Sequence, residues 1–215
     1  MFVRQYKENA GGQYWTLTWK NTSAESLMEQ NRQDPLYPFL KEELVPGSTA
    51  LEVGVGLGNW CRLFPEIKWY GVDTDEEVIA RLGLEAPEIV ASVGSAERTM
   101  LSPVFDYVCS WGVLEHSDTE QEMINEAFRV LKPGGKAFFS VPYINHLRTL
   151  VLSWIAVKNW YNKGCGYAFH QKIYEKSHLV PLLERAGFVN VKVRPLGRAW
   201  DAHMLLLEAT KPRDY

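Results

Sequence analysis

The sequence predicts an α/β fold, with a doubly wound, mainly parallel sheet and helices on both faces. The first observation is a short apolar run at 49–53, which lacks polar alternation and therefore suits a strand buried on both faces of a parallel sheet. The second is that segments of helical length alternate with further strand-length apolar runs, at 68–73, 88–93, 105–110 and 136–142. Such alternation is the pattern of βαβ units.

A glycine-rich turn directly follows the first strand. Because Gly54, Gly56 and Gly58 lack Cβ atoms, the backbone can adopt positive φ and a ligand can approach it closely. The dinucleotide fingerprint G-x-G-x-x-G is not met, since the third glycine comes one residue early and Asn59 takes the place of the last glycine. The carboxylate of Glu52 would repel a pyrophosphate and suits a cationic ligand. The turn alone also fits an ordinary loop, but its composition disfavours NAD.

An acidic residue ends the second strand. In nucleotide-binding α/β folds, an acid at this place accepts hydrogen bonds from both ribose hydroxyls, which assigns Asp73 to the ribose of a nucleoside ligand. A helix N-cap is the alternative role, although 74–77 offer capping residues of their own. Between the two strands we expect a short helix at 59–64, whose first amides point at the ligand.

The first 45 residues are predicted to form a cap made of two short helices and a loop. Thr22 or Ser23 can cap a helix that runs to about Gln33, and a second helix spans 37–44. Because this piece precedes the sheet, it is free to fold over the carboxyl edge. Its aromatic residues are candidates for binding substrate, with ordinary packing as the alternative: Tyr14, Trp15 and, in the same cluster, Trp19.

The second half of the chain continues the alternation. A helix at 119–131 has apolar residues at helical spacing and ends at the turn Lys132-Pro-Gly-Gly135. A helix at 177–187 is predicted with Ser177 as its N-cap and Gly187 as its stop. Two strands, at 188–194 and 203–209, complete the series.

Composition narrows the class of protein. With 215 residues, 46% of them hydrophobic, the chain suits one domain with a sizeable core. A net charge of -3, with basic and acidic residues mixed, provides no field for a phosphate backbone, so nucleic acid is not expected as a partner. No signal-like or bilayer-length apolar run occurs, so we expect a soluble, cytoplasmic protein. The cysteines, expected to be free thiols, have no metal-ligand spacing: Cys61, Cys109 and Cys165.

Several motifs occur in the order and at the separations of one family. They include Glu52-Val-Gly-Val-Gly-Leu-Gly58, Phe105-Asp-Tyr-Val108, Leu114-Glu-His116 and Arg129-Val-Leu-Lys-Pro-Gly-Gly135, with Leu182-Leu-Glu-Arg-Ala-Gly-Phe188 near the end. Together they resemble class I S-adenosylmethionine (SAM) dependent methyltransferases that modify small molecules, such as quinone-precursor and natural-product enzymes. The resemblance covers 48–142 well and 174–195 loosely.

This resemblance implies a Rossmann-like fold with seven strands, mostly parallel, in which the last strand is antiparallel. It implies transfer of a methyl group from SAM to an O, N or C atom of a small-molecule acceptor, mainly by proximity and alignment, with S-adenosylhomocysteine (SAH) as product and no metal. The implied parts of the single domain 1–215 are a cap (1–45), a SAM-binding core (46–142), an inserted lid or substrate region (143–173) and a C-terminal helix with strands (174–215).

The residues implied to bind the cofactor come from four strand ends. At the third, the family often has Gly-Asp-Ala-Glu, whereas this chain has Gly94-Ser-Ala-Glu97, so the adenine contact can pass to Glu97 or to the Ala96 amide. The full implied set is Glu52, Gly54, Val55, Gly56, Gly58, Asp73, Thr74, Ser95, Ala96, Ser110 and Trp111.

Catalysis requires a base only if the acceptor is a hydroxyl, and histidine has a suitable intrinsic pKa. His116 is the candidate because its motif lies nearest the cofactor; the alternative is a histidine that holds the loop through backbone hydrogen bonds. Candidate substrate-binding residues that follow the strand at 136–142 are Tyr143, His146 and Trp154.

The segment 144–160 matches nothing in the family. Its apolar stretch 150–157 is too short to span a bilayer, so we expect a lid, with interfacial membrane contact as the alternative. For the whole protein, the alternatives are a non-catalytic SAM-binding or regulatory module and a methyltransferase that acts on a lipid-like or macromolecular acceptor. A nucleic-acid amino methyltransferase would have Asn-Pro-Pro-Tyr or Asp-Pro-Pro-Tyr where this chain has Trp111-Gly-Val-Leu114. Both a monomer and a homodimer fit the sequence.

Overall fold

The computed structural model describes residues 19–143, 172, 174, 176–197 and 204–214. Four of the predicted substrate-binding residues and the predicted lid at 144–160 therefore lie outside the described residues; the four residues are Tyr14, Trp15, His146 and Trp154. Cys165 lies outside them as well, whereas Cys61 and Cys109 are buried free thiols.

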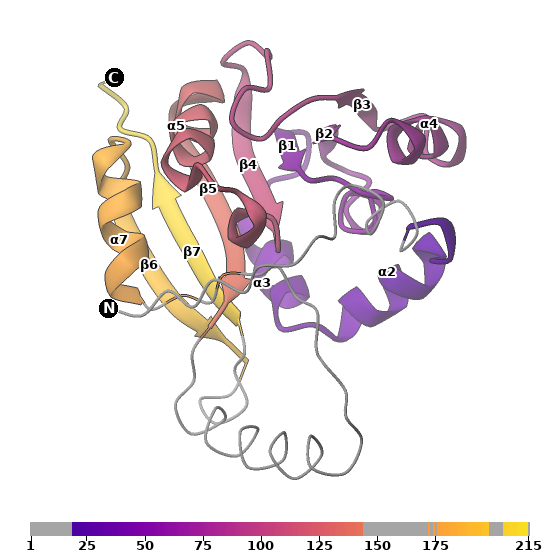
Figure 1. The fold of residues 1–215 in the computed structure, drawn as a ribbon, viewed down its shortest axis with the longest axis horizontal. Helices are drawn as coiled ribbons and strands as arrows, with labels where there is room; N and C mark the ends of the chain where they lie inside the picture. The colour runs from indigo at the N-terminus through magenta and orange to yellow at the C-terminus, as the bar shows by residue number, and fades with distance from the viewer. Residues whose placement is uncertain (1–18, 144–171, 173, 175, 198–203, 215) are drawn as a thin grey trace, which may run out of the picture.

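A central sheet organises the described part of the chain, with seven strands in the order β3-β2-β1-β4-β5-β7-β6 (Figure 1). The strands β1 to β5 pair in parallel, and β7 runs antiparallel between β5 and β6. This confirms the predicted fold class, including the antiparallel last strand. The strands are β1 Thr49–Val53, β2 Lys68–Asp73, β3 Val90–Val93, β4 Phe105–Trp111, β5 Leu131–Pro142, β6 Val189–Leu196 and β7 Met204–Thr210.

Helices cover both faces of this sheet, because successive strand residues point to opposite sides. In β1, Leu51 and Val53 enter one core, while Ala50 enters the other. The first core also receives α5 (Glu120–Val130) and α7 (Lys176–Arg185), and the second receives α3 (Leu36–Glu43) and α4 (Glu76–Glu85). The helix α2 (Ala24–Gln33) packs beside α4 through a third, small cluster.

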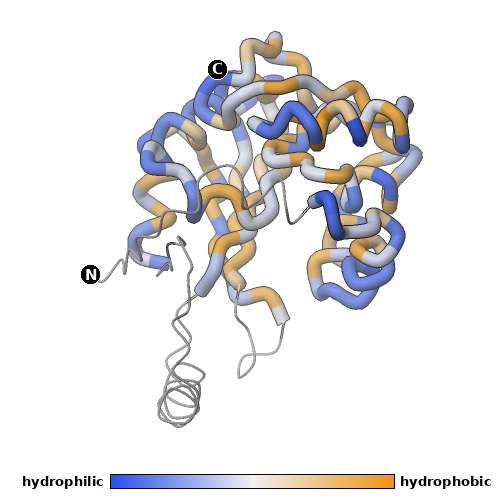
Figure 2. The backbone as a smooth tube through the Cα atoms, turned by 45° about the vertical axis from the view of Figure 1, so that its right-hand side comes forward, coloured by the Kyte–Doolittle hydropathy of each residue, from blue (hydrophilic) through white to orange (hydrophobic). Residues whose placement is uncertain are grey.

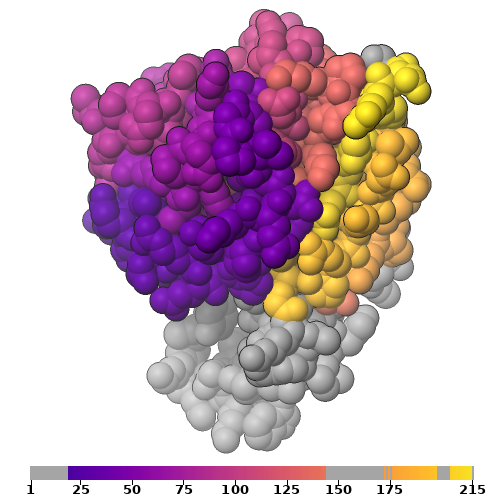
Figure 3. All heavy atoms as spheres, turned by 180° about the vertical axis from the view of Figure 1, so that it is seen from behind, coloured from indigo at the N-terminus to yellow at the C-terminus, as the bar shows by residue number. Residues whose placement is uncertain are grey.

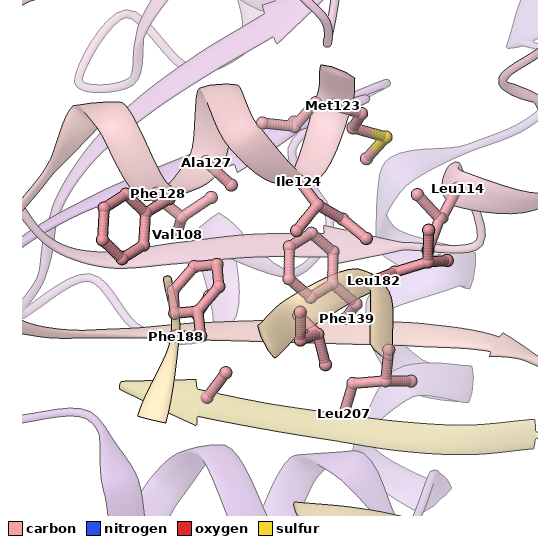
Figure 4. Close-up of a cluster of buried hydrophobic side chains, with 14 of the residues drawn as sticks. Val108, Leu114, Met123, Ile124, Ala127, Phe128, Phe139, Leu182, Phe188 and Leu207 are labelled. Carbon is pink, nitrogen blue, oxygen red and sulfur yellow. The ribbon is translucent and has the colours of Figure 1, made fainter. Parts of the chain in front are cut away.

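The larger core fixes α5 and α7 against the sheet (Figure 4). The rings of Phe128 and Phe188 meet edge to face, with centroids 5.0 Å apart at 89°. Just after α7, Gly187 has φ +99, and a Cβ there would lie 3.0 Å from Phe128 Cζ. The predicted glycine stop is therefore confirmed. Full burial of each such side chain contributes about 1.5–3 kcal/mol.

Hydrophobic residues follow the strands in the middle of the molecule, and hydrophilic residues lie on the outer helices (Figure 2). From behind, the elements of the first half of the chain and those of the last quarter occupy opposite sides (Figure 3), as the strand order requires. Among the described helices, none has the length and apolar character needed to cross a membrane.

The short helix predicted at 59–64 is present only in part. The chain forms only a one-turn 3-10 helix, Cys61–Leu63, and leaves it at Phe64 with φ -130 and ψ 68. Pro65 explains the early end, because the residue before a proline avoids helical angles. Trp60 and Cys61 are buried in the second core and hold the segment down. No long helix therefore offers its first amides to the cavity at this place.

Other boundaries shift by a few residues. Ser23 is the N-cap of α2, accepting from the Ser26 amide at 3.3 Å, as predicted. The prediction of Ser177 as an N-cap is wrong, because α7 already begins at Lys176. The strand β3 begins at Val90 rather than at residue 88, and β5 begins at Leu131 rather than 136, with an irregularity at 132–135 where Phe105 pairs with Leu131 and Tyr107 with Lys136.

Candidate active site

The carboxyl ends of β1, β2 and β4 open into a cavity of about 730 Å³. The strand β1 lies between β2 and β4, so the cavity sits where the strand order reverses, as the sequence predicted. A cavity of this size suits a nucleoside with a short side arm. The predicted site residues that line it are Glu52, Gly54, Val55, Asp73, Thr74, Ala96, Trp111 and His116.

The three glycines of the turn serve different purposes. Gly54 lines the cavity at φ +72, and a Cβ on it would lie 2.3 Å from Val113 Cγ2. Gly56 lies beneath the indole of Trp19, where a Cβ would meet the ring at 2.9 Å. Gly58 packs against α4, since a Cβ there would lie 2.9 Å from Leu82 Cδ1. Of the three, only Gly54 presents bare backbone to the cavity.

Asp73 connects the glycine turn to α4. Its Oδ2 accepts from the Gly56 amide at 3.0 Å, and its Oδ1 accepts from the Asp75 amide at 3.1 Å. The N-cap of α4 is Asp75, which accepts from the amides of Glu77 and Val78. This removes capping as the reason for Asp73, whose oxygens line the cavity and keep further lone pairs for a ligand.

Glu52 is an acidic side chain in an apolar setting. It is only 3% exposed, and Cys61 Sγ donates to its Oε2 at 2.9 Å. Burial, with a contribution from the charge of Asp73, raises the pKa of Glu52 to about 8. Burial also raises the pKa of the Cys61 and Cys109 thiols, so both stay neutral and add no further negative charge. The carboxyl therefore holds a proton at pH 7 until a cation approaches it.

Three indoles border the cavity, of which sequence reasoning assigned one to the cofactor. Trp111 faces Trp60 with ring centroids 6.0 Å apart at 53°, and its buried Nε1 has no hydrogen-bond partner among the described residues. Trp19 lies over the glycine turn, and Arg81 donates to the carbonyl oxygens of Trp19 and Thr22 at 2.6 and 3.1 Å. Trp60 was missed, although an aromatic residue directly after a glycine-rich turn is a usable signal.

The loop after β4 forms another wall of the cavity. It includes Val113, the one-turn 3-10 helix Leu114–His116 and Ser117, and the His116 amide donates to the Val113 carbonyl oxygen at 2.9 Å. This places the predicted base at the cavity and also gives it a part in the loop's own hydrogen bonding. Both roles proposed for His116 are thus compatible with its position.

Of the two side chains considered for the adenine contact, Glu97 lines the cavity and Ser95 does not. Ser95 donates its hydroxyl hydrogen to Glu97, and Ser117 Oγ donates to Glu97 Oε1 at 2.7 Å. Burial raises the pKa of Glu97, but the hydrogen bonds from Ser95 and Ser117 outweigh it and hold the pKa below its usual value. Glu97 is therefore an ionised acceptor at the cavity wall. It is one of the groups to which the sequence assigned the adenine contact in place of Ser95.

Some predicted site residues do not line the cavity. Ser110 is buried, and its hydroxyl has no partner within the described ranges. Tyr143 packs against the larger core and pairs with Tyr174 through a β-bridge. In the part of the chain that is described, no three His, Cys, Asp or Glu side chains gather in a way that suits a metal ion.

The sequence matches one family model and is similar to named proteins from other organisms. A sequence model described as a methyltransferase domain matches residues 26–193. A Mycolicibacterium smegmatis protein named as an S-adenosylmethionine-dependent methyltransferase is 28% identical over 172 residues, which are 75% of this chain and 61% of that protein. The ubiquinone biosynthesis O-methyltransferase of Idiomarina loihiensis is 28% identical over 167 residues, or 70% of this chain and 65% of that enzyme. The chain thus spans less than two thirds of either relative.

A solved structure gives the same fold. In a Haloferax volcanii complex that joins the Trm112 methyltransferase activator to a protein classed as a methyltransferase, one chain matches with a TM-score of 0.70 at 14% identity, covering 98% of this chain and 100% of that one. The family match, by contrast, extends over most of the sequence and includes the glycine turn, Asp73 and the loop after β4. The chain therefore belongs to the class I SAM-dependent methyltransferase family.

Proposed function

We propose that this protein transfers a methyl group from SAM to a small-molecule acceptor. The observation that carries the proposal is the cavity itself, whose lining brings together Glu52, Asp73 and the bare backbone of Gly54. A carboxyl pair suits a ligand that carries positive charge and ribose hydroxyls, and it disfavours a pyrophosphate.

The residues present fit such a cofactor in three respects. Gly54 presents backbone without a Cβ to the cavity, Asp73 offers acceptors for hydroxyl groups, and Glu97 and Ala96 offer an acceptor and a backbone amide for an adenine. The protonated Glu52 becomes a favourable neighbour once a cation is present, because the opposite charge lowers its pKa. When bound, SAM supplies a methyl group already activated by its sulfonium.

The protein's own contribution is alignment and exclusion of water. The indoles of Trp60 and Trp111 give the cavity flat apolar walls. If the acceptor is a hydroxyl, the imidazole of His116 takes its proton, since His116 lines the cavity. An acceptor that is already nucleophilic needs alignment alone.

A small-molecule acceptor is favoured over nucleic acid by the acidic lining. Besides the protonated Glu52, the described lining includes the carboxylates of Asp73 and Glu97, and α4 adds those of Glu76 and Glu77. These charges oppose a phosphate backbone. A lipid-like acceptor, a macromolecular acceptor and a SAM-binding module without chemistry remain as outcomes of the test.

The test is SAM turnover against fractionated metabolites, with SAH release as the readout and an Asp73→Ala variant as the control. We expect SAH to accumulate with one class of small-molecule fraction and to fall with the variant. Tight SAM binding without SAH release in any small-molecule fraction would contradict the proposal. SAH release only in the presence of lipid vesicles or protein fractions would mean that the acceptor is a lipid or a macromolecule and not a small molecule.

A further inference from the structure

The cavity wall formed by residues 112–117 is held from behind by a cluster of three side chains. Lys172 and Tyr174 come from the chain just before α7, and Glu120 comes from the first turn of α5. None of the three lines the cavity. We call them the wall clamp, because Lys172 and Tyr174 donate to carbonyl oxygens of that wall and Glu120 contacts both of them.

Lys172 contacts the wall with its side chain and its backbone. Its Nζ donates to the Ser117 carbonyl oxygen and lies 3.1 Å from Glu120 Oε1, while its amide donates to the Glu115 carbonyl oxygen at 3.2 Å. The side chains of Lys172 and Glu120 are 11% and 16% exposed. The ion pair is therefore largely shielded from water, and it orients the ammonium toward the wall.

Tyr174 supplies the second contact. The side chain is fully buried, and its hydroxyl oxygen lies 2.7 Å from Glu120 Oε1 and 3.2 Å from the Leu114 carbonyl oxygen. Burial and the neighbouring Glu120 carboxylate raise the pKa of Tyr174 far above its usual value, so the hydroxyl remains a donor. The Tyr174 amide also donates to Pro142 at 3.0 Å, which fixes the residue to the end of β5.

The other side of the wall is held by Glu97, which accepts from Ser117 Oγ at 2.7 Å. The wall is a short loop with a single 3-10 turn, so it has few hydrogen bonds of its own to fix its conformation. The carbonyl groups of Leu114, Glu115 and Ser117 all point to the clamp. Local opening of the wall therefore requires the clamp to release.

We propose that Lys172, Tyr174 and Glu120 are positioning residues that hold Val113 and His116 in the geometry needed for methyl transfer. The purpose of this positioning rests on the proposed function, whereas the positioning itself is a property of the protein without ligand. Loss of the clamp leaves Asp73 and Gly54 in place. Acceptor alignment then suffers while cofactor affinity is retained.

The test compares Lys172→Met and Tyr174→Phe with Lys211→Met. Lys211 is a matched control, because its buried Nζ also donates to backbone carbonyl oxygens, those of Phe128 and Leu131 at 2.9 Å each, at the C-terminal end of α5 and so away from Glu120. The first readout is amide hydrogen exchange at residues 112–117. The second is the SAH dissociation constant from calorimetry, and the third is the split between kcat and acceptor KM once SAH release has identified an acceptor.

We expect the two clamp variants to speed exchange at the His116 and Ser117 amides by about tenfold or more, while the control leaves these amides within about threefold of the wild type. SAH affinity should change by less than about threefold in the clamp variants, with kcat falling by about ten- to a hundredfold. Lys172→Arg should restore protection, since a guanidinium keeps the donors.

Unchanged exchange at residues 112–117 in both clamp variants would overturn the proposal, as would equal acceleration in Lys211→Met, which would mean a general loss of stability. Failure of the wild type to bind SAH would instead count against the proposed function, and the exchange data would still decide the clamp.

Discussion

Replacing Glu52 with glutamine tests how the buried carboxyl contributes to the site. Glutamine keeps the shape and an oxygen that can accept from the Cys61 thiol, but it cannot ionise. The rise of the Glu52 pKa from 4.5 to about 8 corresponds to about 5 kcal/mol at 1.36 kcal/mol per pH unit. That figure is an upper limit, because local relaxation lowers the cost of a buried charge.

The sign follows from the raised pKa. The folded protein keeps the proton on Glu52 while the unfolded chain loses it near pH 4.5, so this contribution to stability is complete below pH 4.5 and is lost as pH rises to about 8. Relative to the wild type, Glu52→Gln should therefore gain stability as pH rises over this window. The gain should reach several kcal/mol near pH 8 and then level off.

The assay is urea unfolding of both proteins without ligand at pH 5, 6, 7 and 8, followed by tryptophan fluorescence. Other titrating groups cancel in the difference between wild type and variant. A difference in unfolding free energy that stays constant across this range would refute the raised pKa. The same variant should bind SAM more weakly by about 1.5–3 kcal/mol, because a charged partner is lost. Stability and affinity should thus move in opposite directions.

Further predictions concern the same edge of the sheet. Asp73→Ala should weaken SAM binding by roughly 2–4 kcal/mol in calorimetry, since two charge-assisted hydrogen bonds are lost. Wild-type protein should bind SAM or SAH in the micromolar range and not NAD, and heat from NAD alone would contradict the assignment. Gly54→Ala should lose about 1–3 kcal/mol of stability from positive φ and the clash with Val113, whereas Gly83→Ala, in open space on α4, should gain about 0.5–1 kcal/mol. Trp19→Ala should weaken SAH binding without unfolding the protein, because Trp19 lines the cavity; unaltered affinity would make Trp19 a residue that only packs on Gly56.

The parts of the site that were predictable from sequence are those set by local backbone requirements. Gly54 and Asp73 follow strands whose apolar character is plain, so their place at the carboxyl edge follows from strand order. The helix at 59–64 is present only in part because tertiary packing of Trp60 and a following proline decided the conformation there.

Contacts between segments that are far apart in the chain could not be predicted from the sequence. Lys172 and Ser117 are 55 positions apart, and Tyr174 and Leu114 are 60 apart. A lysine in the unmatched segment and a tyrosine at the start of the loosely matched one carry no pattern that distinguishes a clamp from a solvated surface. Trp19 was within reach only as a member of an aromatic cluster, because what brings it over the glycine turn is Arg81, from α4.

The energetic costs in this protein are concentrated at the edge where the cavity opens. The core between α5, α7 and the sheet is packed by apolar side chains, whereas the opposite face holds the protonated carboxyl of Glu52 near the cavity. Beside it, Gly54 has positive φ, and the buried Trp111 Nε1 has no partner in the described part of the chain. Each feature opposes folding of the protein without ligand, and each suits a polar, cationic ligand with a flat ring system. These departures from good packing lie together in one cavity, where a bound ligand would offset their cost. Scattered departures would have lowered stability with no ligand to offset them, so binding explains why they cluster.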